Sequence, residues 1–330
     1  MAPGGGVTGG YQLVFRAKNL LGPYESRIVL EQGATKVNGP HQGGWVTTGN
    51  ADVSSASSRD WFIHFQEILP YGRILHLQPV KWDNDWPVMG DAPAGAEKGQ
   101  PISTYKIPVA LQSKIENQNS KIVAPQSSDE FNTKILAPQW QWWANFDPAW
   151  ANQTVRPGWL RLTPVSLAKE TPLYNRPNLL LQKFPAETFT ATTRLDLSAL
   201  ADGETAGLVL AGKTMASLTC SRVPSGIKIV RTSFNANNRN TTDEELETDL
   251  ITDNGVIIDL LLHVAPKGVC TFEYRIGKTI RRGIGGPITA INDTWIGAKV
   301  GLFCNAPPGA KPQGHADFDF LHFESNPPKP

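Results

Sequence analysis

The chain has 330 residues, of which 18% are charged and 40% are hydrophobic, and its formal net charge is +1. A chain of this length can form two domains, each with its own core. The near-neutral balance, with no basic stripe and no acidic tail, argues against a nucleic-acid partner and against electrostatic binding to a membrane.

Three further features narrow the class. No apolar run approaches the roughly 20 residues that span a bilayer. Cys220, Cys270 and Cys304 are odd in number and widely spaced, which predicts reduced, buried thiols and not a zinc site. The 30 glycines and 26 prolines follow no period. This composition favours many short strands joined by turns.

Residues 11–90 alternate short strand-like runs with turns. The runs are rich in aromatic and β-branched residues and are bounded by Gly, Pro or Asn. Within the run DWFIHFQEI, Phe62 and His64 face one side, and Trp61 and Phe65 face the other. The pattern predicts about six antiparallel strands, at 11–17, 20–30, 43–48, 60–68, 73–82 and 86–90.

Residues 96–158 are predicted to link two domains. Much of this stretch is polar and has no regular pattern. Ser127 and Glu130 have the spacing of a capping box, which predicts one short helix. Residues 139–159 hold five of the ten tryptophans. Such a density indicates either an aromatic joint between domains or a platform for a sugar, and the sequence leaves both open.

Residues 159–325 show clean alternation. In TFTATTRLDL, the side chains of Phe189, Ala191, Thr193, Leu195 and Leu197 fall on one face. The run CTFEYRI repeats the pattern, and further strand-like runs follow between Gly, Asn and Pro turns. This arrangement predicts a sandwich of two antiparallel sheets.

A series of motifs in chain order resembles glycoside hydrolase family 43, in the type of β-xylosidase and α-L-arabinofuranosidase that has two domains. The motifs are GPYESRIVLEQGATKVNGPHQGGWV, WFIHFQE, YGRILHLQPVKWDNDWPVMG and QWQWWANFDP, followed by GHADFDFLHF near the end. The resemblance implies an all-β fold. Residues 1–95 would be the last one to two blades of a five-bladed β-propeller, and residues 159–325 a concanavalin A-like sandwich.

In this family two aspartates and a glutamate in the propeller carry out inverting hydrolysis. One carboxylate activates water and a carboxylic acid protonates the leaving oxygen. The start of the chain, MAPGGG, resembles the turn that follows the family's general acid. The resemblance therefore implies that no catalytic residue lies in this chain. The chain would be the C-terminal part of a longer enzyme, a gene with a misplaced start, or a degenerate protein.

The same resemblance gives four residues a role near the substrate. His41, in NGPHQGGWV, matches a histidine that helps to hold a hydrated calcium ion, and the alternative is a histidine satisfied within a turn. Arg73 matches an arginine aimed at the sugar hydroxyls, and the alternative is a surface arginine on a strand. Gln42 and Trp45 are expected to line the same channel.

Asp317 and Asp319 form a second candidate site, in the predicted sandwich. They lie two residues apart in ADFDF and project to the same face of a strand. Such a pair either faces water or binds a hard cation such as calcium. The sequence favours water.

Two functions follow from these observations. The first is a glycosidase that releases xylose or arabinofuranose from xylan- or arabinan-derived oligosaccharides. The second is a carbohydrate-binding or structural sandwich without catalysis, which carries a remnant of a propeller. The ordered series of motifs favours the first, and the expected lack of the acid and the base favours the second for this chain alone.

Overall fold

The computed structural model describes the chain except for residues 48–59, 93–95, 107–125, 237–242, 253–255 and 326–330. The described regular structure is β-strand apart from three single turns of 3₁₀-helix, Pro148–Trp150 (η1), Leu173–Asn175 (η2) and Pro266–Gly268 (η4). The predicted all-β class is therefore confirmed. None of the described helices is long and apolar enough to cross a membrane.

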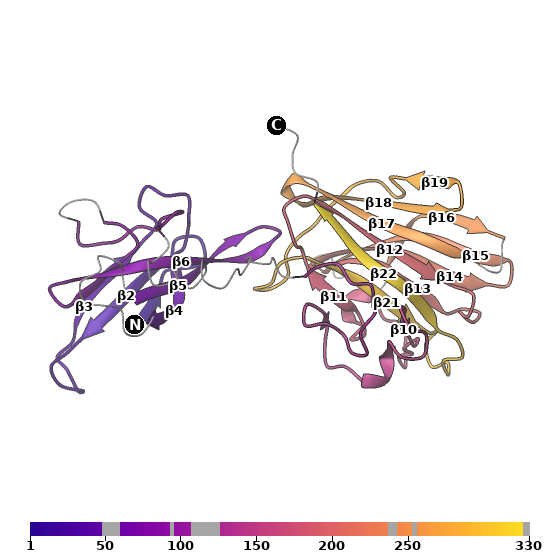
Figure 1. Cartoon of the computed structure of the whole chain (residues 1–330), viewed down its shortest axis with the longest axis horizontal. Coiled ribbons are helices and arrows are strands. Elements are labelled where there is room, and N and C mark those ends of the chain that lie inside the picture. Colours follow the sequence, from indigo (N-terminus) through magenta and orange to yellow (C-terminus); the bar gives the residue numbers. More distant parts are fainter. Residues whose placement is uncertain (48–59, 93–95, 107–125, 237–242, 253–255, 326–330) are drawn as a thin grey trace, which may run out of the picture. The chain divides into compact units, whose positions relative to one another are not determined.

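The chain forms two compact units. Unit 1 consists of Met1–Ile68 and Arg73–Ala124, and unit 2 of Leu69–Gly72 and Pro125–Pro330. Unit 1 has two small sheets (Figure 1). One sheet contains β1 (Ala2–Gly4), β2 (Tyr11–Arg16) and β3 (Glu25–Leu30). The other contains β4 (His41–Thr47), β5 (Asp60–Ile68), β6 (Gly72–Asp83) and β7 (Trp86–Met89).

The two sheets of unit 1 share a small hydrophobic core. Its buried members come from both sheets and are Val29, Leu30, Phe62, Val80 and Met89. Other apolar side chains of β6 stay exposed, with 73% for Leu75 and 52% for Leu77. The two sheets formed by the described residues of unit 1 are fewer than the four or more blades that a closed propeller has. Unit 1 is thus a partial propeller, as predicted.

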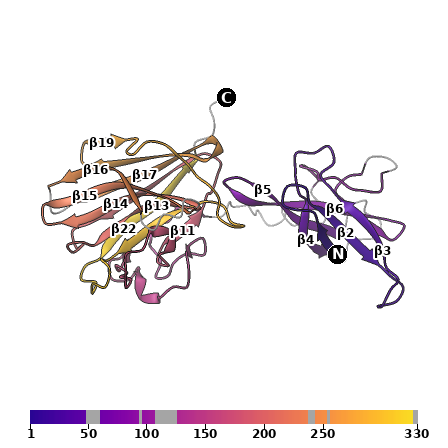
Figure 2. The same cartoon turned by 180° about the vertical axis from the view of Figure 1, so that it is seen from behind.

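Unit 2 is a sandwich of two larger antiparallel sheets (Figures 1 and 2). One sheet has the order β19-β18-β17-β12-β22-β10-β9, with β20 also paired to β18. These strands are β9 (Ala151–Asn152), β10 (Leu160–Leu162), β12 (Phe189–Asp196), β17 (Ile257–Ala265), β18 (Val269–Ile276), β19 (Thr279–Arg282), β20 (Ile288–Thr289) and β22 (Ala316–Ser325).

The other sheet has the order β16-β15-β14-β13-β21-β11-β8. Its strands are β8 (Gln141–Trp142), β11 (Leu180–Lys183), β13 (Thr205–Ala211), β14 (Thr214–Val223), β15 (Gly226–Asn235), β16 (Glu244–Ile251) and β21 (Lys299–Asn305). One face of this sheet packs on the partner sheet. Part of the outward face is also covered, because a second, smaller core there includes Val209, Met215 and Phe303.

The main core lies between the two sheets. Every side chain that the alternation of residues 189–197 placed on one face is buried there: Phe189, Ala191, Thr193, Leu195 and Leu197. Cys220, Cys270 and Cys304 are buried free thiols, as predicted. Burial raises the pKa of Cys220 and of Cys270 to about 12. The alternation of the sequence is therefore the direct cause of this core.

The region predicted as a linker differs in the structure. Residues 107–125 lie outside the described residues, and residues 126–158 belong to unit 2, where they supply β8 and β9. The short helix predicted from Ser127 and Glu130 does not form. Instead Asp129 pairs with Leu321 of β22 through the backbone. The carboxylate of Asp129 accepts from the Nε1–H of Trp140 at 2.8 Å. Long-range pairing has replaced the local capping pattern.

Candidate functional site

His41 begins β4 and is buried. Its Nδ1 lies 2.6 Å from the carbonyl oxygen of Gly39. In the neutral ring Nδ1 carries the proton and donates it to this carbonyl. The lone pair of Nε2 is then left to accept a hydrogen bond from a further partner. Gly39 has a φ of 57°, a left-handed conformation that favours glycine. A side chain on Gly10 would collide with the His41 ring. Glycines thus let the backbone close tightly around the imidazole.

Arg73 and His41 both lie against the aromatic ring of Phe65. The guanidinium carbon of Arg73, on β6, lies 4.2 Å from the ring centroid of Phe65 on β5. The same ring has its centroid 5.5 Å from that of His41 on β4. The structure therefore brings together two residues predicted to share a site. The Nε of Arg73 is buried and has no hydrogen-bond partner among the described residues.

Gln42 and Trp45 have other surroundings. Gln42 is exposed, with a φ of 54°. The ring centroid of Trp45 lies 5.5 Å from that of Trp82. The indole nitrogens of these tryptophans lie 3.4 and 2.9 Å from the two carboxylate oxygens of Asp60. Trp45 and Trp82 line a cleft of about 520 Å³ whose lining includes neither His41 nor Arg73.

A polar cluster on β5 and β6 escaped the sequence analysis. The His64 ring is stacked on that of His76, with centroids 5.2 Å apart. Its Nε2 lies 3.1 Å from Nε2 of Gln78, whose Oε1 accepts from the Ile102 amide at 2.8 Å. Burial lowers the pKa of His64 to about 4. His64 and Gln78 are polar residues at strand positions that face the packed side, and this was the available signal.

Calcium is the metal that the resemblance implies for His41. This ion takes roughly six to eight oxygen ligands. The described part of the chain contains no group of three or more His, Cys, Asp or Glu side chains that could hold a metal ion. His41 offers a single imidazole nitrogen. These residues do not by themselves fit a calcium site.

Asp317 and Asp319 lie on β22 and meet arginines. The buried carboxylate of Asp317 accepts from Nε of Arg161 at 2.8 Å and from Nη1 of Arg156 at 3.1 Å. Burial alone would raise the pKa of Asp317, but hydrogen bonds from these arginines outweigh burial and lower it. Asp319 lies 3.9 Å from Nη1 of Arg194. Two guanidinium groups exclude a cation from Asp317 and shield it from water. The two aspartates therefore belong to a network of ion pairs, and neither a cation site nor a water-facing pair is formed.

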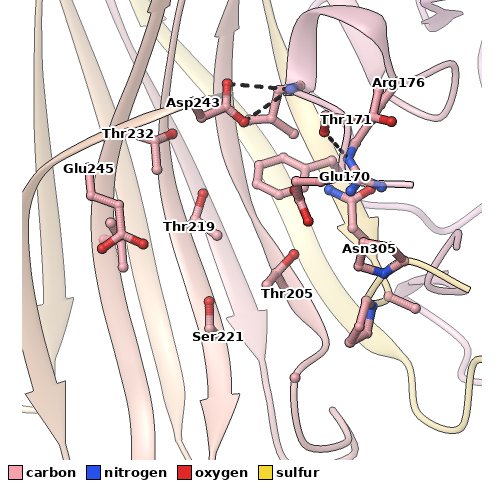
Figure 3. Close-up of a pocket in the computed structure, with 17 residues that line it drawn as sticks. Glu170, Thr171, Arg176, Thr205, Thr219, Ser221, Thr232, Asp243, Glu245 and Asn305 are labelled. Carbon is pink, nitrogen blue, oxygen red and sulfur yellow. Dashed lines mark hydrogen bonds between the residues drawn. The ribbon is translucent and has the colours of Figure 1, made fainter. Parts of the chain in front are cut away.

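Unit 2 also carries a cleft of about 450 Å³, lined by the seven-stranded sheet and by the segments around residues 170–176 and 306–308 (Figure 3). Hydroxyl side chains project from its floor, namely those of Thr205, Thr219, Ser221 and Thr232. Charged side chains also line it, namely those of Glu170, Arg176, Asp243 and Glu245. The sequence analysis did not find this cleft. The available signal was the run of Ser217, Thr219 and Ser221 on the outward side of β14, at positions where charged residues are usual.

Two curated proteins resemble this chain. A protein of Xylanibacter ruminicola, provisionally named a beta-xylosidase, is 40% identical over 213 residues, which are 64% of this chain and 36% of that protein. A beta-xylosidase of Formosa agariphila is 26% identical over 345 residues, covering 96% of this chain and 54% of that protein. The chain thus spans about a third to a half of the length of these relatives.

Solved structures agree with the fold. A bifunctional GH43-CE protein of Bacteroides eggerthii matches 97% of this chain and 38% of its own, with a TM-score of 0.75 and 25% identity. The GH43 protein BlXynB of Bacillus licheniformis matches 98% of this chain and 62% of its own, with a TM-score of 0.73 and 21% identity. These matches confirm the predicted partial propeller followed by a concanavalin A-like sandwich.

The family comparison covers most of unit 2. The profile of the beta-xylosidase C-terminal concanavalin A-like domain matches residues 128–324. The match starts close to Asp129, where the described sandwich begins, and ends within β22. The chain therefore belongs to glycoside hydrolase family 43, in the group that carries this C-terminal domain.

Proposed function

We propose that this chain is part of a glycosidase that releases xylose or arabinofuranose from xylan- or arabinan-type substrates with inversion at the anomeric carbon. Membership of the family supports a glycosidase, and the names of the curated relatives support the xylosidase type. The chain spans only part of the length of those relatives, so their activity is proposed for it and is not carried over from them.

The observation that carries the proposal is the shared contact of Arg73 and His41 with the ring of Phe65. Arg73 is held by its contact with the Phe65 ring, and its buried Nε has no partner among the described residues. A guanidinium has five N–H donors in a fixed plane, which suits neighbouring sugar hydroxyls or a catalytic carboxylate. Nε2 of His41 would accept a hydrogen bond from a water molecule or from a sugar hydroxyl.

The acid and the base are proposed to lie outside this chain. Inversion uses two carboxyl groups roughly 6.5–9.5 Å apart, with a water between one of them and the sugar. No hydrogen bond or ion pair joins Arg73 to a carboxylate among the described residues. A carboxylate brought to Arg73 from elsewhere would be kept ionised by the guanidinium, as a general base has to be.

The test starts from the gene upstream of Met1. We expect roughly 200 further codons, the length of about three more blades, with two aspartates and a glutamate. The extended protein should hydrolyse 4-nitrophenyl β-D-xyloside or α-L-arabinofuranoside, with inversion seen by proton NMR. The 330-residue chain should give only the background rate.

Arg73→Ala in the extended protein should lower kcat/KM by about 100-fold or more. Arg16→Ala is the matched control, because the Arg16 guanidinium carbon also lies 4.2 Å from an aromatic centroid, that of Trp86. An inactive extended protein, a clearly active 330-residue chain, or equal effects of the two substitutions would each contradict the proposal.

A further inference from the structure

The cleft of unit 2 lies on the outward face of the seven-stranded sheet, away from the main core and beside the smaller core that contains Leu173 and Phe303 (Figure 3). In β14, Leu218 and Cys220 are buried in the core, so Thr219 and Ser221 face outward. The same alternation turns Thr205 of β13 outward. The cleft is therefore built on regular strands, which hold its side chains more firmly than a loop would.

Three polar residues form a row across the floor. Thr205 pairs in register with Asn305 of β21 on one side and with Ser221 of β14 on the other. Neighbouring strands set such residues about 4.8 Å apart. The hydroxyls of Thr205 and Ser221 are half-buried and have no hydrogen-bond partner among the described residues. Oδ1 of Asn305 accepts from Asn178 at 3.0 Å, which leaves its amide N–H groups to donate.

A second pair of hydroxyls is held in place beside this row. The Ser217 hydroxyl lies 2.7 Å from that of Thr219 and 2.6 Å from that of Thr232. Ser217 is fully buried, so these two contacts fix the orientation of both threonines. Val230 and Phe303 also line the cleft, and both side chains are buried. The exposed part of the floor is therefore mainly polar, with oriented hydroxyls.

The charges of the cleft disfavour an anionic ligand. Glu170, Asp243 and Glu245 contribute three carboxylates, whereas Arg176 is the cation among the described lining residues. Glu245 is paired with Lys228 at 2.8 Å, so Glu170 and Asp243 still outnumber Arg176. Nε of Arg176 donates to the carbonyl of Thr171 at 3.0 Å and is not free for a ligand. The Asp243 carboxylate accepts from the Leu173 amide at 3.1 Å, and each carboxylate oxygen can accept more than one hydrogen bond.

The outward face of the opposite sheet is different. There Arg194 pairs with Asp259 at 2.8 Å, and Arg275 and Arg282 both pair with Glu273. Such ion pairs satisfy the polar groups of a sheet that faces water. The row of Asn305, Thr205 and Ser221 has no comparable mutual pairing. Half-buried hydroxyls that lie in a cleft without a protein partner among the described residues are available to a ligand.

We propose that this cleft is a binding site for a neutral polyhydroxylated ligand, a short pentose oligosaccharide. Hydroxyls, an amide and carboxylates supply both donors and acceptors for sugar hydroxyls. The class of ligand follows from the cleft, and the choice of pentoses rests on the proposed function. The site would hold the substrate chain without taking part in its cleavage.

The test uses the whole chain, labelled for NMR, with xylotriose and arabinotriose as separate probes. At least one probe should shift the amide signals of β13, β14 and β21, with a dissociation constant in the millimolar range. The double variant Thr205→Val, Ser221→Ala should weaken binding about tenfold, as expected for the loss of two hydrogen bonds. Thr192→Val is the matched control, because Thr192 is a half-buried threonine on β12 of the other sheet, and it should bind like the parent.

Several results would overturn the proposal. These are no binding of either probe, shifts that avoid the three strands, equal affinity in the double variant, or tighter binding of trigalacturonate than of the neutral probes. If the double variant melts early, Asp243→Asn provides the second variant, and weaker binding is again expected. Repeating the titration with Arg73→Ala separates the two proposals, because cleft binding should survive that substitution even if the proposed hydrolysis fails.

Discussion

Acid should destabilise unit 1 through His64. Gln78 is oriented by the Ile102 amide, which donates to its Oε1, so Gln78 presents an N–H group to Nε2 of His64. If Nε2 of His64 were protonated, its N–H would point at the N–H of Gln78 and the hydrogen bond between them would be lost. Nδ1 of His64 lies 3.2 Å from the carbonyl oxygen of Phe65, which fits a neutral ring with its proton on Nδ1. The fold therefore accepts only the uncharged imidazole.

The size of the effect follows from the lowered pKa. Burial takes the pKa of His64 from 6.5 to about 4, and a tenfold change in proton affinity is about 1.4 kcal/mol. The charged ring thus costs the folded state about 3 kcal/mol. Since the unfolded chain binds the proton first, stability is highest above about pH 6.5 and falls as the pH drops toward 4. By about pH 4.5 the loss should reach about 2.5 kcal/mol.

The assay compares the parent with His64→Phe. Urea unfolding at about pH 7 and about pH 4.5 would be followed in unit 1 by pulse-labelling hydrogen exchange of peptides from β5 and β6. The variant should be less stable at neutral pH by about 1–3 kcal/mol, because Gln78 loses its acceptor, but it should lack the acid-induced loss. His322→Gln, which removes an imidazole beside Glu130 in unit 2, should keep that loss. A His64 ring that titrates near 6.5 by carbon-13 NMR, or equal pH dependence of His64→Phe and the parent, would refute the reasoning.

Three further predictions concern unit 2. Asp317→Ala should lower the free energy of unfolding by about 3 kcal/mol, because it leaves Arg156 and Arg161 without their shared partner. Since the pKa of Asp317 is lowered in the fold, that contribution is present above about pH 4 and lost below it, which thermal melts over a pH series would show. Asp243→Asn should stabilise unit 2 by about 1–3 kcal/mol at neutral pH, because burial raises the pKa of Asp243 to about 6. The gain should vanish below about pH 4 in urea titrations, and an unchanged stability at neutral pH would contradict it. Cys220, Cys270 and Cys304 should react with Ellman's reagent only as fast as unit 2 unfolds, because burial raises the pKa of all three thiols, and fast labelling of the native chain would show that they are accessible.

Local alternation predicted most of the sandwich. The faces of β12 and β18 are as the sequence implies, because each strand is buried on one side and packs through residues two positions apart. The six strands expected in residues 11–90 are all present. For the same reason His64 shares a face with Phe62, and their ring centroids are 6.1 Å apart.

The failures arise from contacts between residues distant in sequence. Asp317 meets Arg161 across 156 residues, and nothing near ADFDF signals an arginine. Ser127 and Glu130 have a local pattern for a helix, but the pairing of Asp129 with Leu321 outweighs it. The cleft joins strands and loops from Glu170 to Pro308, so only the folded sheet reveals it. Arg73 and His41 were placed together by resemblance, and their shared contact with Phe65 could not be read from spacing alone.

The segment of residues 141–152 matters for anyone who divides this chain. It supplies β8, an edge strand of one sheet, and β9, an edge strand of the other, and so connects the two layers of the sandwich. A recombinant fragment that begins at residue 159 would leave β11 and β10 as unpaired edge strands, which promote aggregation. A fragment that begins at residue 126 keeps β8, β9 and the hydrogen bond from Trp140 to Asp129. It is the better choice for expressing the sandwich by itself.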